Sequence, residues 1–199
     1  GHEIKILATI SRTVAGSKTK TLNNDSTVAV SSQTTIESGT IPLGKADVFK
    51  LENVYMSSGF GASASASDTD ITDRFDLDTG QRDNFYDIGR IKLKPGAIVP
   101  TGQLLVKFDF FSHGTGDYFD VDSYSGVVDY EDIPSYTSDT TGQKFELRDS
   151  LDFRPRVDDA STINSGTDDR SYDGSGSSLV DIPEFGSDIT SDLEFYLSR

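Results

Sequence analysis

Apolar side chains recur at every second position near the middle of this chain, and that pattern restricts its fold more than any other feature. The apolar positions are Leu104, Val106, Phe108 and Phe110, with Lys107 and Asp109 on the opposite side. A period of two places one set of side chains on a single face of a β-strand. Such a face must be buried against a second layer, so we predict a layered β fold.

Residues 89–94 show the same period, since Ile91 and Leu93 face one way and basic side chains face the other. Turn-forming sequences at 95–96 and 100–102 bracket the loop between this segment and residues 103–111. Two alternating segments joined by a loop are typical of a hairpin. We therefore predict that these two strands pair with each other in antiparallel fashion.

Helix is disfavoured by the acidic residues, because 26 of the 33 are Asp and Asp prefers caps and turns. Further strands are predicted at 3–10, 26–31, 34–38, 46–56 and 192–197. Short helices are predicted only at 81–86, capped by Asp78, and at 147–153. The predicted fold class is mostly β: an antiparallel, sandwich-like domain with long loops and one or two short helices.

Low-complexity sequence divides the chain into three parts. An N-terminal β segment covers 3–58, a Gly-, Ser- and Ala-rich loop covers 59–70, and the main β domain covers 71–199 with a mobile polar loop near 158–178. The first part either forms its own sheet or completes that of the main domain. Gly1 and His2 resemble a cloning remnant, and both ends of the sequence suggest a fragment of a longer protein.

Charge and composition argue against several classes of partner. The formal net charge is −15, whereas a nucleic-acid surface needs a clustered basic face. No run of about 18 apolar residues is present, so no membrane-spanning segment is predicted. There are no cysteines, which excludes disulfides and thiolate metal sites.

Arginine and aspartate cluster among apolar residues in two segments, 72–87 and 147–157. A buried guanidinium needs a carboxylate partner, and the planar fork of Arg suits that pairing. We predict an internal polar network that fixes loop conformation, in preference to a pocket for an acidic ligand. Its predicted members are Arg74, Arg82, Asp83, Asp87, Arg148, Asp149, Asp152 and Arg154.

Calcium is the one metal that the Asp-rich turns bring into consideration. Asp169 and Asp173 match the first half of an EF-hand loop, but the twelfth position is Val180 and no helices are expected beside it. Asp76 with Asp78, and the trio Asp117, Asp120 and Asp122, are weaker alternatives. Solvated turn carboxylates are the favoured interpretation of each, and no other cofactor is expected.

No catalytic constellation emerges from the sequence. His113 follows Ser112 directly, and adjacent strand residues point in different directions, which is poor geometry for a catalytic triad; we predict a structural role for His113. Carboxylates are too evenly spread to single out a glycosidase pair. Tyr118 and Tyr124 are candidates for stacking on a sugar ring.

Several long motifs resemble a domain of uncharacterised function from large virion structural proteins of contractile-tailed phages, notably cyanophages. The resemblance covers about 71–199 and is carried by 73–74, 78–87, 90–96, 108–111, 116–119, 121–124, 130–136, 147–157, 186–190 and 194–199. It implies no catalytic residues.

The resemblance implies a structural part of the virion, associated with the tail, baseplate or tail fibre. Its expected partners are other virion subunits and further copies of the chain, with a trimer as one arrangement. A carbohydrate-binding module for host recognition is the first alternative. A carboxylate-dependent polysaccharide depolymerase is the second.

Overall fold

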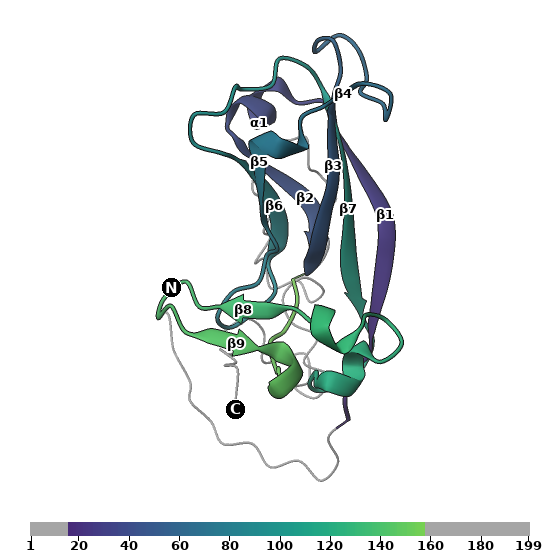
Figure 1. Cartoon of the computed structure of the whole chain (residues 1–199), viewed down its shortest axis with the longest axis vertical. Coiled ribbons are helices and arrows are strands. Elements are labelled where there is room, and N and C mark those ends of the chain that lie inside the picture. The colour runs from purple at the N-terminus through teal and green to yellow at the C-terminus, as the bar shows by residue number, and fades with distance from the viewer. Residues whose placement is uncertain (1–15, 158–199) are drawn as a thin grey trace, which may run out of the picture.

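The computed structural model describes residues 16–157, so the predictions for 3–10, 158–178 and 192–197 lie outside the described residues. Two antiparallel sheets face each other and form a sandwich (Figure 1). The first has the strand order β1-β7-β3-β4 and the second the order β2-β6-β5. The predicted mostly-β, sandwich-like class with antiparallel sheets and a few short helical turns is confirmed.

The elements of the sandwich come from the first three-quarters of the described chain. They are β1 (Lys20–Val30), α1 (Gln33–Glu37), β2 (Thr40–Ala46), β3 (Val48–Met56), β4 (Thr69–Asp70), the 3-10 turn η1 (Thr72–Arg74), β5 (Phe75–Asp78), β6 (Ile88–Leu93) and β7 (Leu104–His113). Both sheets combine strands from 20–56 with strands from 69–113. The N-terminal segment therefore lies in the same sheets as the segment after the low-complexity loop.

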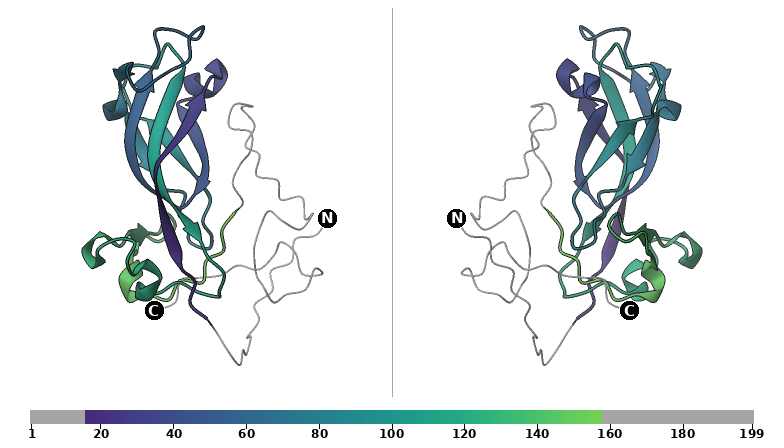
Figure 2. Two further views of the ribbon diagram at one scale, coloured as in Figure 1. Left: turned by 90° about the vertical axis from the view of Figure 1, so that its right-hand side faces the viewer. Right: turned by 90° about the vertical axis from the view of Figure 1, so that its left-hand side faces the viewer.

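A smaller unit follows β7 and packs against one end of the sandwich (Figure 2). It contains η2 (Val121–Tyr124), η3 (Tyr130–Asp132), the hairpin of β8 (Ser135–Thr137) with β9 (Lys144–Glu146), and η4 (Leu147–Asp149). Its apolar residues Tyr124, Ile133 and Leu147 pack against Phe111 at the end of β7. We call residues 114–157 the lower unit.

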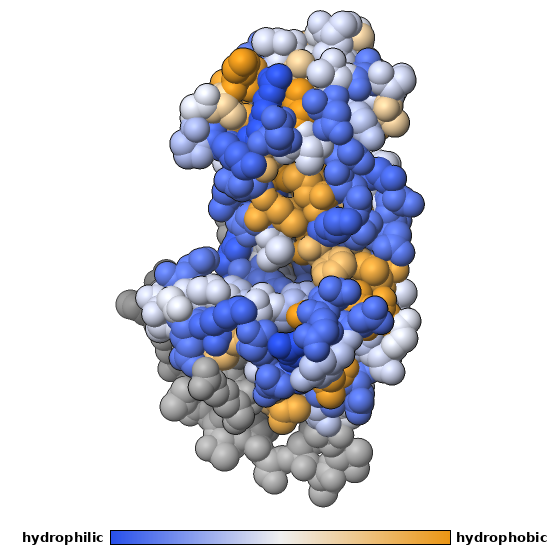
Figure 3. Space-filling view, viewed as in Figure 1, coloured by the Kyte–Doolittle hydropathy of each residue, from blue (hydrophilic) through white to orange (hydrophobic). Residues whose placement is uncertain are grey.

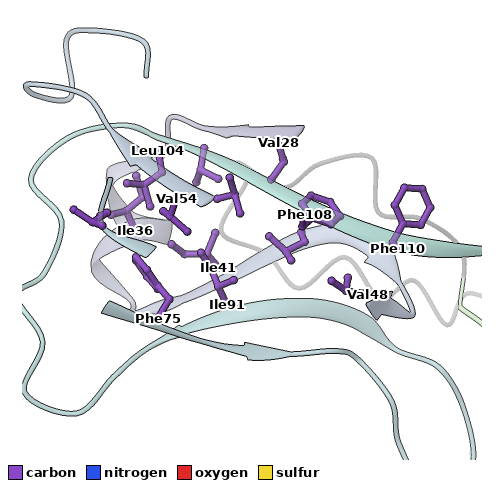
Figure 4. Close-up of a cluster of buried hydrophobic side chains, with 14 residues drawn as sticks. Val28, Ile36, Ile41, Val48, Val54, Phe75, Ile91, Leu104, Phe108 and Phe110 are labelled. Carbon is purple, nitrogen blue, oxygen red and sulfur yellow. The ribbon is translucent and has the colours of Figure 1, made fainter. Parts of the chain in front are cut away.

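The main core lies between the two sheets (Figure 4). The alternating face of β7 supplies Leu104, Val106, Phe108 and Phe110, all buried there as predicted. Ile91 of β6 is buried in the same cluster and Leu93 packs against it. The opposite face of β6 carries Lys92, which pairs with Asp78 in the neighbouring strand at 2.8 Å. The period-two pattern thus identified the buried face of both strands.

The predicted hairpin between these two strands is wrong. β6 pairs with β2 and β5, whereas β7 pairs with β1 and β3 in the other sheet. The apolar faces of β6 and β7 meet across the sandwich, and the loop at 94–103 crosses from one sheet to the other. Burying two apolar faces against each other removes more surface from water than pairing them edge to edge.

Two local predictions are also wrong. The segment predicted as a strand at 34–38 forms most of the helix α1 and its C-cap Ser38. The Ser32 hydroxyl accepts a hydrogen bond from Thr35 N and caps the first turn, while Ile36 is fully buried in the core. Residues 81–86 form no helix. Asp78, the predicted cap, instead lies in β5 and binds the Arg82 guanidinium.

Replacing Phe108 with Ala should lower the free energy of unfolding by about 3–5 kcal/mol, because it opens a cavity at the centre of the sandwich. Urea unfolding followed by circular dichroism measures the change. Lys107→Thr is the matched control, since this neighbour projects from the outer face of the same strand and forms an exposed pair with Asp25. Equal effects of the two substitutions would contradict the packing described.

Candidate functional site

A single residue, Asp47, turns the chain from one sheet into the other. It stands between the last residue of β2 and the first of β3, with φ at +56°. Asp is among the few residues that enter this left-handed region readily. Its carbonyl accepts a hydrogen bond from Phe111 N at 3.0 Å. The residue is 1% exposed, so the corner holds its carboxylate inside the protein.

Two side chains from neighbouring strands converge on that carboxylate. Lys20 of β1 and His113 of β7 are paired across the sheet. Lys20 Nζ donates to Asp47 Oδ2 at 2.6 Å, and His113 Nε2 lies 2.7 Å from the same oxygen. The side chains of Lys20 and Asp47 are 0% and 1% exposed. The three residues form a charged cluster that is shielded from water.

Aromatic rings surround the Lys20 ammonium group. Its Nζ lies 4.6 Å from the centroid of Phe119, 4.7 Å from Tyr86, 4.9 Å from Tyr124 and 5.3 Å from Phe111. These distances are within the range in which a ring face attracts a cation. The rings replace part of the hydration that burial removes, but they also make the surroundings of the pair apolar.

A second buried ion pair lies beside the first and is joined to it by a phenol. Asp152 and Arg154 are 2% and 1% exposed, and Arg154 Nη2 lies 2.9 Å from Asp152 Oδ2. The Tyr86 hydroxyl donates to Asp152 Oδ2 and accepts from Lys20 Nζ at 3.3 Å and from Arg154 Nη2 at 3.1 Å. Tyr86 therefore connects the two ion pairs into one buried network.

The rest of the Arg154 fork is also bound. Nη2 donates to Gln81 Oε1 at 3.0 Å, and Nη1 donates to the Arg82 carbonyl at 2.9 Å. The guanidinium carbon lies 4.4 Å from the Tyr86 ring centroid and 4.8 Å from that of Tyr136. A cation held from several sides in this way fixes the chain segments that supply its partners.

Backbone hydrogen bonds hold these segments against one another. Tyr86 N donates to the Pro155 carbonyl at 2.8 Å, and Val157 N donates to the Tyr86 carbonyl at 2.9 Å. Phe119 and Asp152 exchange a pair of bonds, each of 2.8 Å. The network thus sits where residues 81–87, 119 and 152–157 meet the ends of β1 and β7.

A close approach at Gly80 allows the 78–87 loop to fold back. Asp87 N donates to the Gly80 carbonyl at 2.6 Å, and Gly80 has φ at +85°. A Cβ on Gly80 would lie 2.1 Å from the Asp87 carbonyl oxygen, so a larger residue cannot occupy this position without moving the loop.

Burial and charge pairing oppose each other in setting the pKa values of the cluster. Burial disfavours the charge on Lys20, but the Asp47 carboxylate nevertheless raises the pKa of Lys20 above its ordinary value. Burial likewise disfavours the Asp47 charge, yet Lys20 and then His113 hold the pKa of Asp47 well below its usual range. The ion pair is therefore the resting state of these two side chains.

The pKa values of His113, Asp152 and Tyr86 are shifted in different directions. Burial lowers the pKa of His113 to about 4, although its contact with Asp47 works in the opposite direction. Burial opposes the Asp152 charge, but Arg154 keeps the pKa of Asp152 below its ordinary value. Burial raises the pKa of the Tyr86 hydroxyl well above its ordinary value. At neutral pH the imidazole and the phenol are therefore neutral.

The structure brings together part of the predicted Arg–Asp network. Asp152 and Arg154 are central to it, and Arg82 lies beside them and contacts Asp78 at 2.9 Å and Asp87 at 3.6 Å. Asp83 accepts a hydrogen bond from the Tyr136 hydroxyl at 2.7 Å. Five of the eight predicted residues, namely Arg82, Asp83, Asp87, Asp152 and Arg154, therefore lie in or next to the site.

The other three predicted members lie elsewhere, on the surface. Arg74 donates to the Ile98 carbonyl at 3.3 Å, and Arg148 pairs with the exposed Glu131 at 2.9 Å. Asp149 is exposed. Arg74 and Arg148 are half-buried, and η1 and η4 hold all three residues away from the network.

Sequence reasoning missed Lys20, Asp47, Gln81 and Tyr86 as members of the network. Lys20 and Asp47 stand in segments with no motif, and only the fold brings them together. One signal was present for Asp47, because a lone Asp between two apolar strand segments marks a turn.

Tyr124 cannot stack on a sugar, which corrects that prediction. It is 2% exposed and packs edge-on against Phe111, with the ring centroids 5.7 Å apart. Tyr118 is half-buried and lies 5.6 Å from Phe153, centroid to centroid. Tyr124 was misjudged because a Tyr in a polar, Asp-rich stretch has the composition of a surface loop, whereas η2 turns it inward.

Some of the predicted calcium ligands lie outside the described residues, and others bind groups of the protein. Asp169 and Asp173 lie outside the described residues, so calcium there stays a hypothesis. Asp120 accepts a hydrogen bond from Ser123 N and caps η2, and Asp78 binds Arg82 and Lys92. Within residues 16–157 no group of three His, Cys, Asp or Glu side chains is placed to hold a metal ion.

Comparisons with known proteins identify no relative that assigns a role to this site. No protein-family profile, no curated protein and no solved structure matches this chain. What the site contains is a buried amine against a carboxylate, a neutral imidazole on that carboxylate, and a phenol leading to a second carboxylate. Because the cluster is enclosed, its charged groups contact other groups of the same chain.

Replacing Asp152 with Ala should lower the free energy of unfolding by about 3–5 kcal/mol, because Arg154 and Lys20 would lose a buried counter-charge. Urea unfolding at neutral pH gives the value. Asp149→Ala is the matched control, since this carboxylate is exposed and lies three residues away. A loss below about 1 kcal/mol for Asp152→Ala, as found for surface pairs, would contradict the buried network.

Acidification should destabilise the protein well before its carboxylates are protonated. Below the ordinary pKa of 6.5 the unfolded chain binds a proton at His113, whereas the folded chain does so only near a pKa of about 4. Stability is therefore complete above the upper value and falls as the pH drops between the two, by about 3 kcal/mol at most.

Unfolding free energies measured at intervals across this range test the expectation. His113→Gln keeps an N–H donor for Asp47 but does not titrate, so the variant should lose most of the slope between the two pKa values. Both proteins should still lose stability at lower pH, where Asp152 becomes protonated on unfolding. An unchanged slope in the variant would assign the effect to other groups.

Proposed function

We propose that this chain is a rigid structural module of a phage virion, part of the tail, baseplate or tail-fibre apparatus, and that it is not an enzyme. The observation that carries the proposal is the enclosure of the Lys20–Asp47 and Asp152–Arg154 pairs. These four charged groups are engaged with one another inside the fold rather than turned toward a substrate. A buried, fully paired network fixes the relative positions of its segments.

The motifs behind the resemblance meet in this network. Segment 78–87 supplies Gln81 and Tyr86, segment 116–119 supplies Phe119, and segment 147–157 supplies Asp152 and Arg154. These segments are far apart in the sequence but adjacent in the structure. Because these segments form one buried network, they hold one another in fixed positions, as a rigid structural module requires.

The surface is consistent with subunit contact. The face seen in Figure 3 is largely hydrophilic, with hydrophobic residues gathered near its middle. Among the described residues, Ile98, Val121, Tyr130 and Leu151 are exposed by 38–71%. Apolar surface bounded by polar residues is typical of interaction sites. Within residues 16–157 no helix has the length and apolar character to cross a bilayer.

The carbohydrate-binding alternative now depends on Tyr118, the candidate that is only half-buried. Tyr130 is 52% exposed and stacks on the Arg148 guanidinium, 4.8 Å from centroid to carbon. A glycan array separates the two functions, since binding lost on Tyr118→Ala but kept in Tyr124→Phe would favour the glycan module.

Antibody raised to this chain should label the tail, baseplate or fibres of purified virions in immunogold electron microscopy. The label follows from the structural role, because a virion subunit is present in every particle. Blots of denatured particles control for an epitope buried by neighbouring subunits. Absence of the band from particles whose other subunits are detected would overturn the proposal.

A further inference from the structure

We propose that Lys20 and Asp47 react with each other: the lysine amine and the aspartate carboxyl condense into an intramolecular amide that covalently joins β1 to the β2–β3 corner. The inference does not depend on the proposed function, since it concerns the interior of the chain alone. Three features of the structure carry it: the contact of the reacting groups, a route for the proton that must leave the amine, and a donor on the carboxylate.

The reacting groups are already in contact. Lys20 Nζ lies 2.6 Å from Asp47 Oδ2, so the nitrogen is one C–O bond beyond this contact from the carboxyl carbon, close to a near-attack geometry of about 3–3.5 Å. Both side chains are held rigidly, the lysine among four rings and the aspartate at a corner with φ at +56°.

A proton route leads away from the amine. The resting ammonium must lose a proton before nitrogen can attack, and it donates to the Tyr86 hydroxyl at 3.3 Å. That hydroxyl in turn donates to Asp152 Oδ2. A proton passed from Lys20 to Tyr86, with the phenol proton passed on to Asp152, leaves a neutral amine and a protonated carboxyl without any water molecule.

His113 is placed to stabilise the charge that develops on Asp47. Its Nε2 lies 2.7 Å from Oδ2, and a neutral imidazole with its proton on Nε2 donates to that oxygen. When nitrogen attacks the carboxyl carbon, negative charge collects on the carboxyl oxygens. A donor already in position there, in surroundings without water, lowers the barrier to attack.

The step balances without an oxidant or a reductant. The C–N bond forms between Asp47 Cγ and Lys20 Nζ, and one Asp47 C–O bond breaks. The proton stored on Asp152 returns through the Tyr86 hydroxyl to the nitrogen. That proton and a second one from the nitrogen then pass across the 2.6 Å Nζ–Oδ2 contact, and the protonated oxygen leaves as water. The starting ammonium and carboxylate together carry no net charge, and the amide is neutral. The apolar rings around the site favour a neutral product over a buried ion pair.

The bond would close a loop of the chain between positions 27 residues apart. It would tie an edge strand of the first sheet to the crossing point of the two sheets. Tension applied along β1 would then pass into a covalent bond at this corner rather than into hydrogen bonds alone.

Intact-mass spectrometry of the purified, denatured chain is the test. We expect a mass lower than that of the sequence by one water. Double digestion with trypsin and a glutamate-specific protease should then release peptide 19–37 joined to peptide 46–50, with 38–45 set free between them. This pair is not contiguous in the sequence, so an incomplete digest cannot imitate it.

Two outcomes would overturn the inference. One is a mass equal to that of the sequence after prolonged incubation of the folded protein at neutral pH. The other is the loss of one water without the joined peptides, which would indicate a cyclic imide at an aspartate. Neither outcome bears on labelling of virions, so the two proposals fail separately.

Variants identify the roles of the residues. Lys20→Arg keeps the positive charge beside Asp47 but should show the full sequence mass, whereas Lys18→Arg, two positions away, should still lose one water. Tyr86→Phe keeps the ring and removes the relay hydroxyl, so cross-linking should slow at least tenfold in a time course after refolding. Unchanged kinetics in Tyr86→Phe would exclude the proposed proton route.

Discussion

The cost of removing charge from water is the constraint on which this structure depends. Lys20, Asp47, Asp152 and Arg154 are each at most 2% exposed, and an isolated buried ion costs several kcal/mol. Each must therefore find its partner before the fold is complete. The partners come from β1, the β2–β3 corner and residues 152–154, so satisfying the charges also fixes the arrangement of these segments.

The sequence predicted those parts of the fold that local pattern determines. The buried faces of β6 and β7 follow from a period of two, and the scarcity of helix follows from the excess of Asp over Glu. The hairpin prediction was wrong because alternation identifies a buried face but not the strand that lies beside it. Pairing depends on which faces meet across the core, and that information is distributed over the whole chain.

The candidate site was predictable to the extent that its residues lie in motifs. Asp152 and Arg154 stand two residues apart among apolar neighbours, and a buried Arg needs a carboxylate nearby. Lys20 is 66 residues from Tyr86 and 27 from Asp47, and nothing local relates them. Tyr86 and Tyr124 illustrate the same limit, because a tyrosine in a polar loop turns inward only when the fold supplies a cavity of its size.

Tyr86 and Arg154 also explain how the lower unit is attached to the sandwich. The Arg154 guanidinium lies between the rings of Tyr86 and Tyr136, and Tyr136 belongs to β8 of the lower unit. Tyr136 in turn donates to Asp83, next to the loop that supplies Gln81. Apolar contacts alone would let two packed units slide, because the hydrophobic effect has no direction.

Directional bonds to a planar guanidinium allow only one orientation. Arg154 and Tyr86 therefore link the lower unit to Lys20 and Asp47, at the point where the two sheets join. A covalent bond at that corner would strengthen the position through which the described parts of the fold are connected.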